Sequence, residues 1–224
     1  MNADDVKERR IAWAMLILCP LSMLLMFAYV TLGYARGLAA GHPMDYLQTT
    51  CILWAAVMTV LPILRLARLV ALPHWFAALL YADMYLFVVT LCQGLYFDVF
   101  WWADLTHVIS SMVVTSIAFM TLCLMHARSP SHVSFGSRGG IVAMLILIGC
   151  SFGAVWEIME GLTGILTGVD YMSYGALHTM GNLTADTIGI VFMATLAWVM
   201  LGRRDAEAIA SGIRLGKKKI DAGA

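Results

Sequence analysis

The chain has 224 residues, of which 61% are hydrophobic and 12% are charged, and its formal net charge is zero. Soluble domains are nearer half apolar and a quarter charged, so the composition excludes an ordinary soluble protein, and the balanced charge gives no reason to expect a nucleic-acid partner. A mean hydropathy of +0.83 predicts a multi-pass protein of the lipid bilayer.

Six apolar runs approach or exceed the ~18–20 residues that a membrane-spanning helix needs. They predict helices over residues 11–32, 47–64, 75–95, 104–126, 141–162 and 181–201. The first run is too long for the core of a signal peptide and shows no clear cleavage site, so it is expected to remain as an anchor. The prediction is an all-α bundle of six transmembrane helices forming a single membrane domain over 1–224, with an N-terminal segment at 1–10, the helices within 11–201 and a basic tail at 202–224.

The basic residues predict the orientation. In a six-helix arrangement nearly all of them fall on one side: Lys7, Arg9, Arg10, Arg65, Arg68, Arg128, Arg138, Arg203, Arg204, Arg214, Lys217, Lys218 and Lys219. Only Arg36 falls on the other side. Since cytoplasmic loops carry the excess of Lys and Arg, both termini are expected in the cytoplasm, and the loops 33–46, 96–103 and 163–180 outside. The expected location is a bacterial cytoplasmic (inner) membrane.

Polar residues of three helices are predicted to converge near the outer surface. Counting ~1.5 Å per helical residue brings the following residues to similar depths: Asp104, His107, Glu157, Glu160, His178, Asn182 and Asp186. Residues three or four apart share a helix face, so Asp104 lies above His107 and Asn182 above Asp186. Charged side chains facing lipid are costly, so these faces are expected to point into the bundle.

Small residues support the same arrangement. Gly149, Gly153 and Gly164 continue the face that carries Glu157 and Glu160. Small residues let helices approach closely, so this stripe is expected to pack against protein. The five cysteines lie in or beside apolar runs without any C-x-x-C pair, which predicts free buried thiols.

Two kinds of chemistry fit a cluster of carboxylates and imidazoles. His107, Glu157 and Asp186 are candidate ligands of a divalent metal ion. Alternatively, Asp104, His107, Glu157, Glu160 and Asp186 are candidates for general acid–base catalysis. The plain structural alternative is that these residues end and cap helices at the interface. If they share one pocket, the Glu157 and Asp186 carboxylates should lie within roughly 8 Å of the His107 ring, because one ion with ~2 Å ligand bonds, or one water, would bridge them.

Asp83 lies near the middle of the third predicted helix. An intramembrane carboxylate indicates a functional position, here a proton relay or the deep end of a cavity. The alternative is a protonated Asp that binds a neighbouring helix.

An Asp-x-x-His that opens one helix, a Glu pair in the next and a polar Asn/Asp helix together resemble the VanZ-like membrane proteins and the related YjdF-type inner-membrane family. The resemblance covers about residues 104–198. It implicates Asp104, His107, Glu157 and Asp186, with Glu160 and Asn182 beside them, and it implies a role in the cell envelope.

Three functions remain open from the sequence. The first is an enzyme that acts on a lipid-linked or envelope substrate at the outer leaflet, with Glu157 or Asp104 as the base and His107 as a proton carrier or ligand. The second is a small proton- or cation-coupled transporter that uses Asp83 and Asp186. The third is a non-catalytic subunit of a larger membrane complex.

Overall fold

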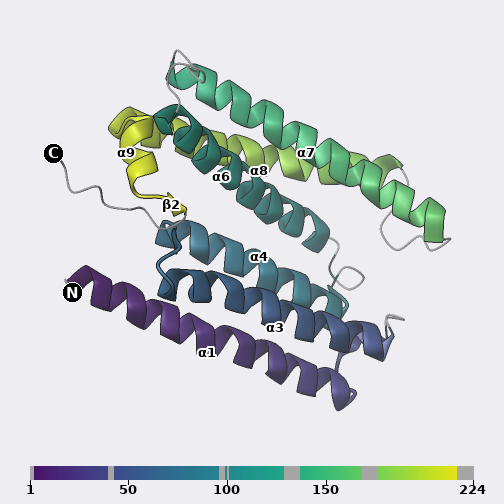
Figure 1. The fold of residues 1–224 in the computed structure, drawn as a ribbon. Coiled ribbons are helices and arrows are strands. Elements are labelled where there is room, and N and C mark those ends of the chain that lie inside the picture. Colours follow the sequence, from purple (N-terminus) through teal and green to yellow (C-terminus); the bar gives the residue numbers. More distant parts are fainter. Residues whose placement is uncertain are drawn as a thin grey trace. The chain divides into compact units, whose positions relative to one another are not determined.

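The computed structural model describes residues 3–39, 43–95, 99, 101–128, 137–167 and 176–215. Parts of the expected loops 33–46, 96–103 and 163–180, and the lysine-rich end of the tail, lie outside these residues. Six helices are long and apolar enough to cross a membrane. They are α1 (Ala3–Thr31), α3 (Met44–Leu66), α4 (His74–Gln93), α6 (Trp102–Arg128), α7 (Arg138–Thr167) and α8 (Ala176–Arg203), shown in Figure 1. The predicted all-α fold with six spans is confirmed.

The contacts divide the chain into two compact units. One comprises Met1–Phe100 with Gly212–Ala224, and the other comprises Trp101–Ser211. The predicted acidic and histidine residues all belong to the second unit, whereas Asp83 belongs to the first.

The first unit is built on α1, α3 and α4. The helix α1 packs along α3, and the Ser22 hydroxyl of α1 lies 2.5 Å from the Tyr85 hydroxyl of α4. The Tyr81 hydroxyl of α4 donates to the Met58 carbonyl of α3 at 2.6 Å. A short helix, α2 (Arg36–Ala39), contacts α4. The strand β1 (Val70–Ala71) pairs antiparallel with β2 (Arg214–Leu215), so the end of the tail returns to the turn between α3 and α4.

The second unit is built on α6, α7 and α8, which all contact one another. Its apolar core includes Phe119, Leu145 and Ala197, none of them accessible to solvent. The tail begins with a short helix, α9 (Ala206–Ser211), that packs on α6. There the His126 ring contacts the Glu207 carboxylate at 3.1 Å.

Several helices are longer than their apolar runs. The helix α1 begins at Ala3 rather than near residue 11, because polar residues continue a helix wherever they remain in water. The helix α7 continues to Thr167 and α8 already begins at Ala176. By contrast, α4 ends at Gln93, two residues before the predicted end, because Gly94 adopts the left-handed conformation (φ 65°) that closes a helix.

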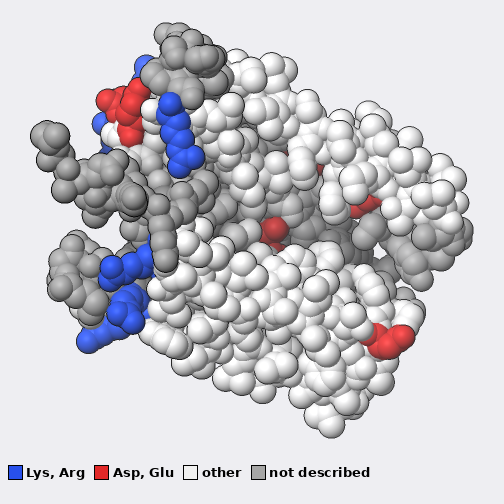
Figure 2. Space-filling model, in the orientation of Figure 1, with Lys and Arg blue, Asp and Glu red and all other residues white. Residues whose placement is uncertain are grey.

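Figure 2 shows basic side chains at one end of the helices of each unit and few charges on the flanks in view, whereas Arg36 of α2 follows the opposite end of α1. Arg9 and Arg10 of α1 lie at the same end of their unit as Arg68, which follows α3. In the second unit, Arg128, Arg138 and Arg203 lie at the end remote from His107. Apolar flanks suit contact with lipid chains, and the side of the membrane that the basic ends face remains a prediction.

Of the cysteines, Cys51 and Cys92 are fully buried, with their sulfur atoms 3.8 Å apart, and Cys123 is buried. All five are free thiols, as expected, but Cys150 is exposed and Cys19 half-buried. An exposed position on α7 suits a cysteine, because its small apolar side chain is compatible with lipid.

Candidate site between α6, α7 and α8

The site is positioned first by a close approach of α6 and α8, which run in the same direction. A Cβ atom on Gly189 of α8 would collide with the Ser111 hydroxyl and the Val108 carbonyl oxygen of α6. Only glycine therefore permits this spacing of the two helices. Nearer the start of both helices, Gly181 of α8 lies close to Asp104 of α6. A Cβ atom on this glycine would lie 3.9 Å from Oδ1 of Asp104. The contacts at these positions fix the alignment of α6 with α8.

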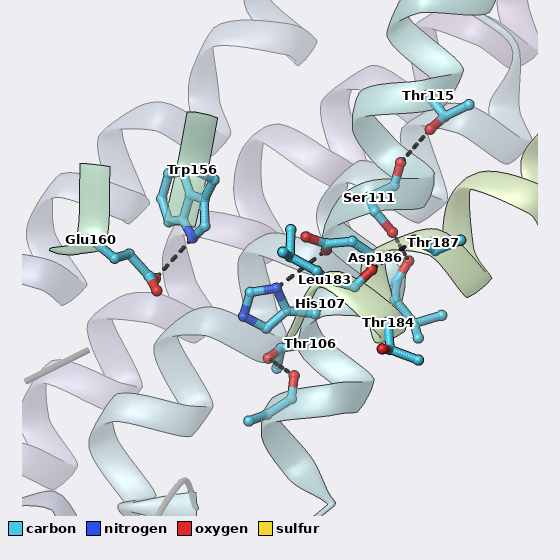
Figure 3. A network of polar contacts seen from close by, with 12 residues as sticks. Thr106, His107, Ser111, Thr115, Trp156, Glu160, Leu183, Thr184, Asp186 and Thr187 are labelled. Atoms are coloured by element: carbon cyan, nitrogen blue, oxygen red, sulfur yellow. Dashed lines mark hydrogen bonds and ion pairs between the residues drawn. The ribbon is translucent and has the colours of Figure 1, made fainter. Parts of the chain in front are cut away.

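At this interface His107 of α6 meets Asp186 of α8. Its Nδ1 atom lies 3.2 Å from Oδ1 of Asp186, and the two side chains are only 15% and 9% exposed. Figure 3 shows the ring turned toward this carboxylate. A carboxylate that accepts the Nδ1 hydrogen fixes the tautomer of the ring and leaves Nε2 as a base. Among the described residues Nε2 has no hydrogen-bond partner.

The helix α7 packs antiparallel to α8 through its small residues. A Cβ atom on Gly149 would lie 2.8 Å from the Ile190 side chain, and one on Gly153 would lie 2.9 Å from Oδ2 of Asp186. The predicted stripe of small residues on α7 therefore does face protein at these two positions. Because Gly153 has no side chain, the Asp186 carboxylate fits between α7 and His107.

The two glutamates of α7 lie beside this pair. Both are close enough for their charges to act on the His107 ring. Glu160 accepts a hydrogen bond of 2.8 Å from Nε1 of Trp156 (Figure 3). The Oε1 atom of Glu157 is buried, and the described residues offer it no hydrogen-bond partner. Trp156 thus orients one carboxylate, while the other remains unsatisfied.

Asn182 has the least satisfied side chain of this group. It is 1% exposed, and neither its Nδ2 nor its Oδ1 atom has a hydrogen-bond partner among the described residues. Asp104 is exposed near the start of α6, and His178 is half-buried in the first turn of α8. His178 was expected just before the helix, but it lies within it because α8 begins earlier than its apolar run.

The group lies deeper than the sequence indicated. Asp186 is ten residues beyond the start of α8, and Glu157 is ten residues before the end of α7. At ~1.5 Å per residue both lie about 15 Å from those helix ends, and His107 lies about 8 Å from the start of α6. The expectation of a site close to the helix ends is wrong, because α7 and α8 continue past the Thr, Gly and His residues at which their apolar runs were taken to stop.

The metal hypothesis is not supported. Among the described residues, no group of three or more His, Cys, Asp or Glu side chains is arranged to hold a metal ion. His107 and Asp186 are paired with each other, and Glu160 is bound to Trp156. Of the three expected ligands His107, Glu157 and Asp186, only His107 and Asp186 are joined by a contact within hydrogen-bond distance.

Asp83 is half-buried in the middle of α4, in the other unit, and it makes its own polar or electrostatic interaction there. We expect Asp83→Asn to fold like the wild type, because an amide keeps the shape and hydrogen bonding while removing the titration. A role in proton movement predicts slower proton uptake by proteoliposomes under an imposed membrane potential. Uptake equal to wild type between about pH 5 and 8 would make Asp83 structural.

Three contributions were not evident from the sequence. The first is the approach of Gly181 to Asp104, for which the glycine beside Asn182 is the one signal in the sequence. The hydrogen bond from Trp156 to Glu160 is the second. Glu207 was not linked to His126, because their contact depends on how α9 folds back on α6.

The fold and the site define a multi-pass α-helical membrane protein with a histidine–aspartate pair inside its last three spans. Residues 20–203 match the profile of a family described as predicted membrane protein (DUF2238). This match covers most of the chain, which therefore belongs to that family. The comparisons give no support to the VanZ-like or YjdF-like resemblance. No curated protein and no solved structure matches the chain.

Proposed function

We propose that this protein is a membrane-embedded enzyme that uses His107 as a general acid–base on a lipid-linked or envelope substrate. The observation that carries the proposal is the contact of 3.2 Å between His107 and Asp186 at low exposure. Asp186 holds the ring with Nε2 as the base and stabilises the imidazolium that forms when the ring takes a proton. This is how an aspartate assists a histidine in hydrolases, used here as a chemical parallel only.

Neighbouring polar residues support a chemical role for the pair. The hydroxyl groups of nearby residues such as Thr115 and Thr184 donate hydrogen bonds to backbone carbonyls one turn earlier. Glu157 and Asn182 keep buried polar atoms without such partners among the described residues. Keeping unsatisfied polar atoms inside a membrane protein costs free energy, which is reasonable if a substrate meets them.

The test compares lipid extracts from a host whose own copy of the gene has been deleted. His107→Gln should lower turnover by about 10²-fold or more, so a lipid or lipid-linked species should accumulate as it does without the protein. Wild type should remove it. The matched control is His126→Gln, because His126 also pairs with a carboxylate but at the other end of α6. Equal extracts from His107→Gln and wild type would contradict the proposal and favour a structural role.

The proposal places the site toward the outer leaflet, which requires both termini to be cytoplasmic. Reporter domains fused after Arg36 and after Gly175 are expected to give an extracytoplasmic signal, and a fusion after Arg204 a cytoplasmic one. The reason is the one-sided distribution of Lys and Arg. Cytoplasmic signals at both Arg36 and Gly175 would invert the topology and put the site at the inner leaflet.

A further inference from the structure

We infer that the pair Asn182 and Glu157 binds the amino-alcohol part of a substrate, meaning a positively charged amine with a neighbouring hydroxyl group. The inference rests on the proposed function for the role of His107, but its evidence is separate. It comes from helix alignment, from unsatisfied buried atoms and from the distribution of charge in the second unit.

Helix alignment sets Asn182 opposite Glu157. The antiparallel helices α7 and α8 contact each other at Gly149 with Ile190, and at Gly153 with Asp186. Glu157 lies one turn after Gly153 on α7, and Asn182 lies one turn before Asp186 on α8. Residues four apart share a helix face, so these two residues come opposite each other. A Cβ atom on Gly181, the residue before Asn182, would lie 3.9 Å from Oδ1 of Asp104, so a carboxylate of α6 lies near this turn of α8.

The buried atoms of Asn182 and Glu157 that lack hydrogen-bond partners include both acceptors and a donor. Oδ1 of Asn182 and Oε1 of Glu157 need hydrogen donors, whereas Nδ2 of Asn182 needs an acceptor. An ammonium group supplies donors, and a hydroxyl oxygen accepts from Nδ2. A ligand that carries both groups side by side satisfies all three atoms.

The carboxylates around Asn182 and Glu157 favour a ligand with a positive charge. The second unit has four carboxylates in this region, those of Asp104, Glu157, Glu160 and Asp186, and two imidazoles, those of His107 and His178. The sequence contains no Lys or Arg between residues 69 and 127 or between 139 and 202. A phosphate group would therefore meet carboxylates without any arginine or lysine of these helices to bind it, whereas an ammonium group would be attracted.

This ligand also fits the chemistry proposed for His107. A substrate hydroxyl held by Nδ2 of Asn182 would present its proton to the histidine. When that proton moves to Nε2, the imidazolium is stabilised by Asp186, and the hydroxyl oxygen becomes a nucleophile. The amine would not react; it would bind to the carboxylates and so position the substrate.

The test measures the unfolding temperature of the protein in nanodiscs, by tryptophan fluorescence, with amines that differ only in a phosphate. Ethanolamine and O-phosphoethanolamine represent a water-borne source, and sphinganine and sphinganine 1-phosphate represent a lipid source. At roughly ten times its Kd, the unphosphorylated amine should raise the unfolding temperature by about 3 °C. The pair that gives the difference identifies the source.

Two variants locate the effect. Asn182→Leu removes both unsatisfied atoms at similar volume, so it should fold at least as stably as wild type yet lose the response to the amine. Glu157→Gln should weaken the response about tenfold in amine concentration, whereas Glu207→Gln, which removes an equally charged group at the other end of the unit, should leave it unchanged.

The inference is overturned if neither amine stabilises the wild type, if the phosphorylated amines stabilise it equally, or if Asn182→Leu still responds. Binding does not require turnover, and the lipid extracts of the His107→Gln host do not depend on any added amine. Failure of the ligand inference and failure of the acid–base proposal are therefore read from different experiments.

Discussion

Replacing Gly189 by alanine is expected to separate α6 from α8 and to destabilise the second unit. The added methyl group would meet the Val108 carbonyl oxygen, which is part of a helix backbone and cannot rotate away, as well as the Ser111 hydroxyl. Overpacking of this kind costs about 1–3 kcal/mol. The unfolding temperature in nanodiscs should therefore fall by several degrees.

The control for this experiment is Gly161→Ala on α7, where a Cβ atom would meet nothing within 4 Å. Since alanine favours a helix over glycine, this variant should be as stable as wild type or more so. Equal unfolding temperatures for Gly189→Ala and wild type would show that the close approach of α6 and α8 does not hold the unit together.

Replacing Asp186 by alanine is expected to abolish the proposed activity almost as completely as loss of His107. Without its partner the ring is free to rotate, and nothing fixes Nε2 as the base. Loss of an oriented general base lowers turnover by about 10²–10⁴-fold, so the same lipid species should accumulate in both variants.

The double variant of His107 and Asp186 distinguishes a working pair from two separate residues. Residues that act as one unit give non-additive losses, so the double variant should be no worse than His107→Ala alone. Additive losses would mean that Asp186 acts independently of the ring, for example by binding substrate directly.

The sequence was sufficient for the fold class, because span length and hydropathy follow directly from the apolar runs. The helix ends were harder to predict. The helix α7 extends to Thr167 and α8 starts at Ala176, because isolated Thr, Gly and His residues interrupt the apolar runs without ending the helices. The site consequently lies deeper than the count from the apolar runs suggested.

The candidate site could be predicted in outline but not in detail. Helix periodicity puts His107 and Asp186 on inward faces, and the small residues on α7 indicate a packed seam. Which carboxylate reaches the ring depends on the alignment of three helices, which Gly153 and Gly189 set through contacts invisible in the sequence. The unsatisfied state of Asn182 has no sequence signal at all, because most buried asparagines find partners.

The proposed activity requires a His107 ring that Asp186 holds in one tautomer. Nitrogen NMR of the protein in nanodiscs measures that tautomer directly. With ¹⁵N-labelled histidine, and His107 assigned by its loss in His107→Gln, we predict that at a pH where the ring is neutral it is protonated at Nδ1, and that its signal shifts in Asp186→Ala. A ring protonated at Nε2, or a signal indifferent to Asp186→Ala, would contradict the oriented histidine–aspartate pair.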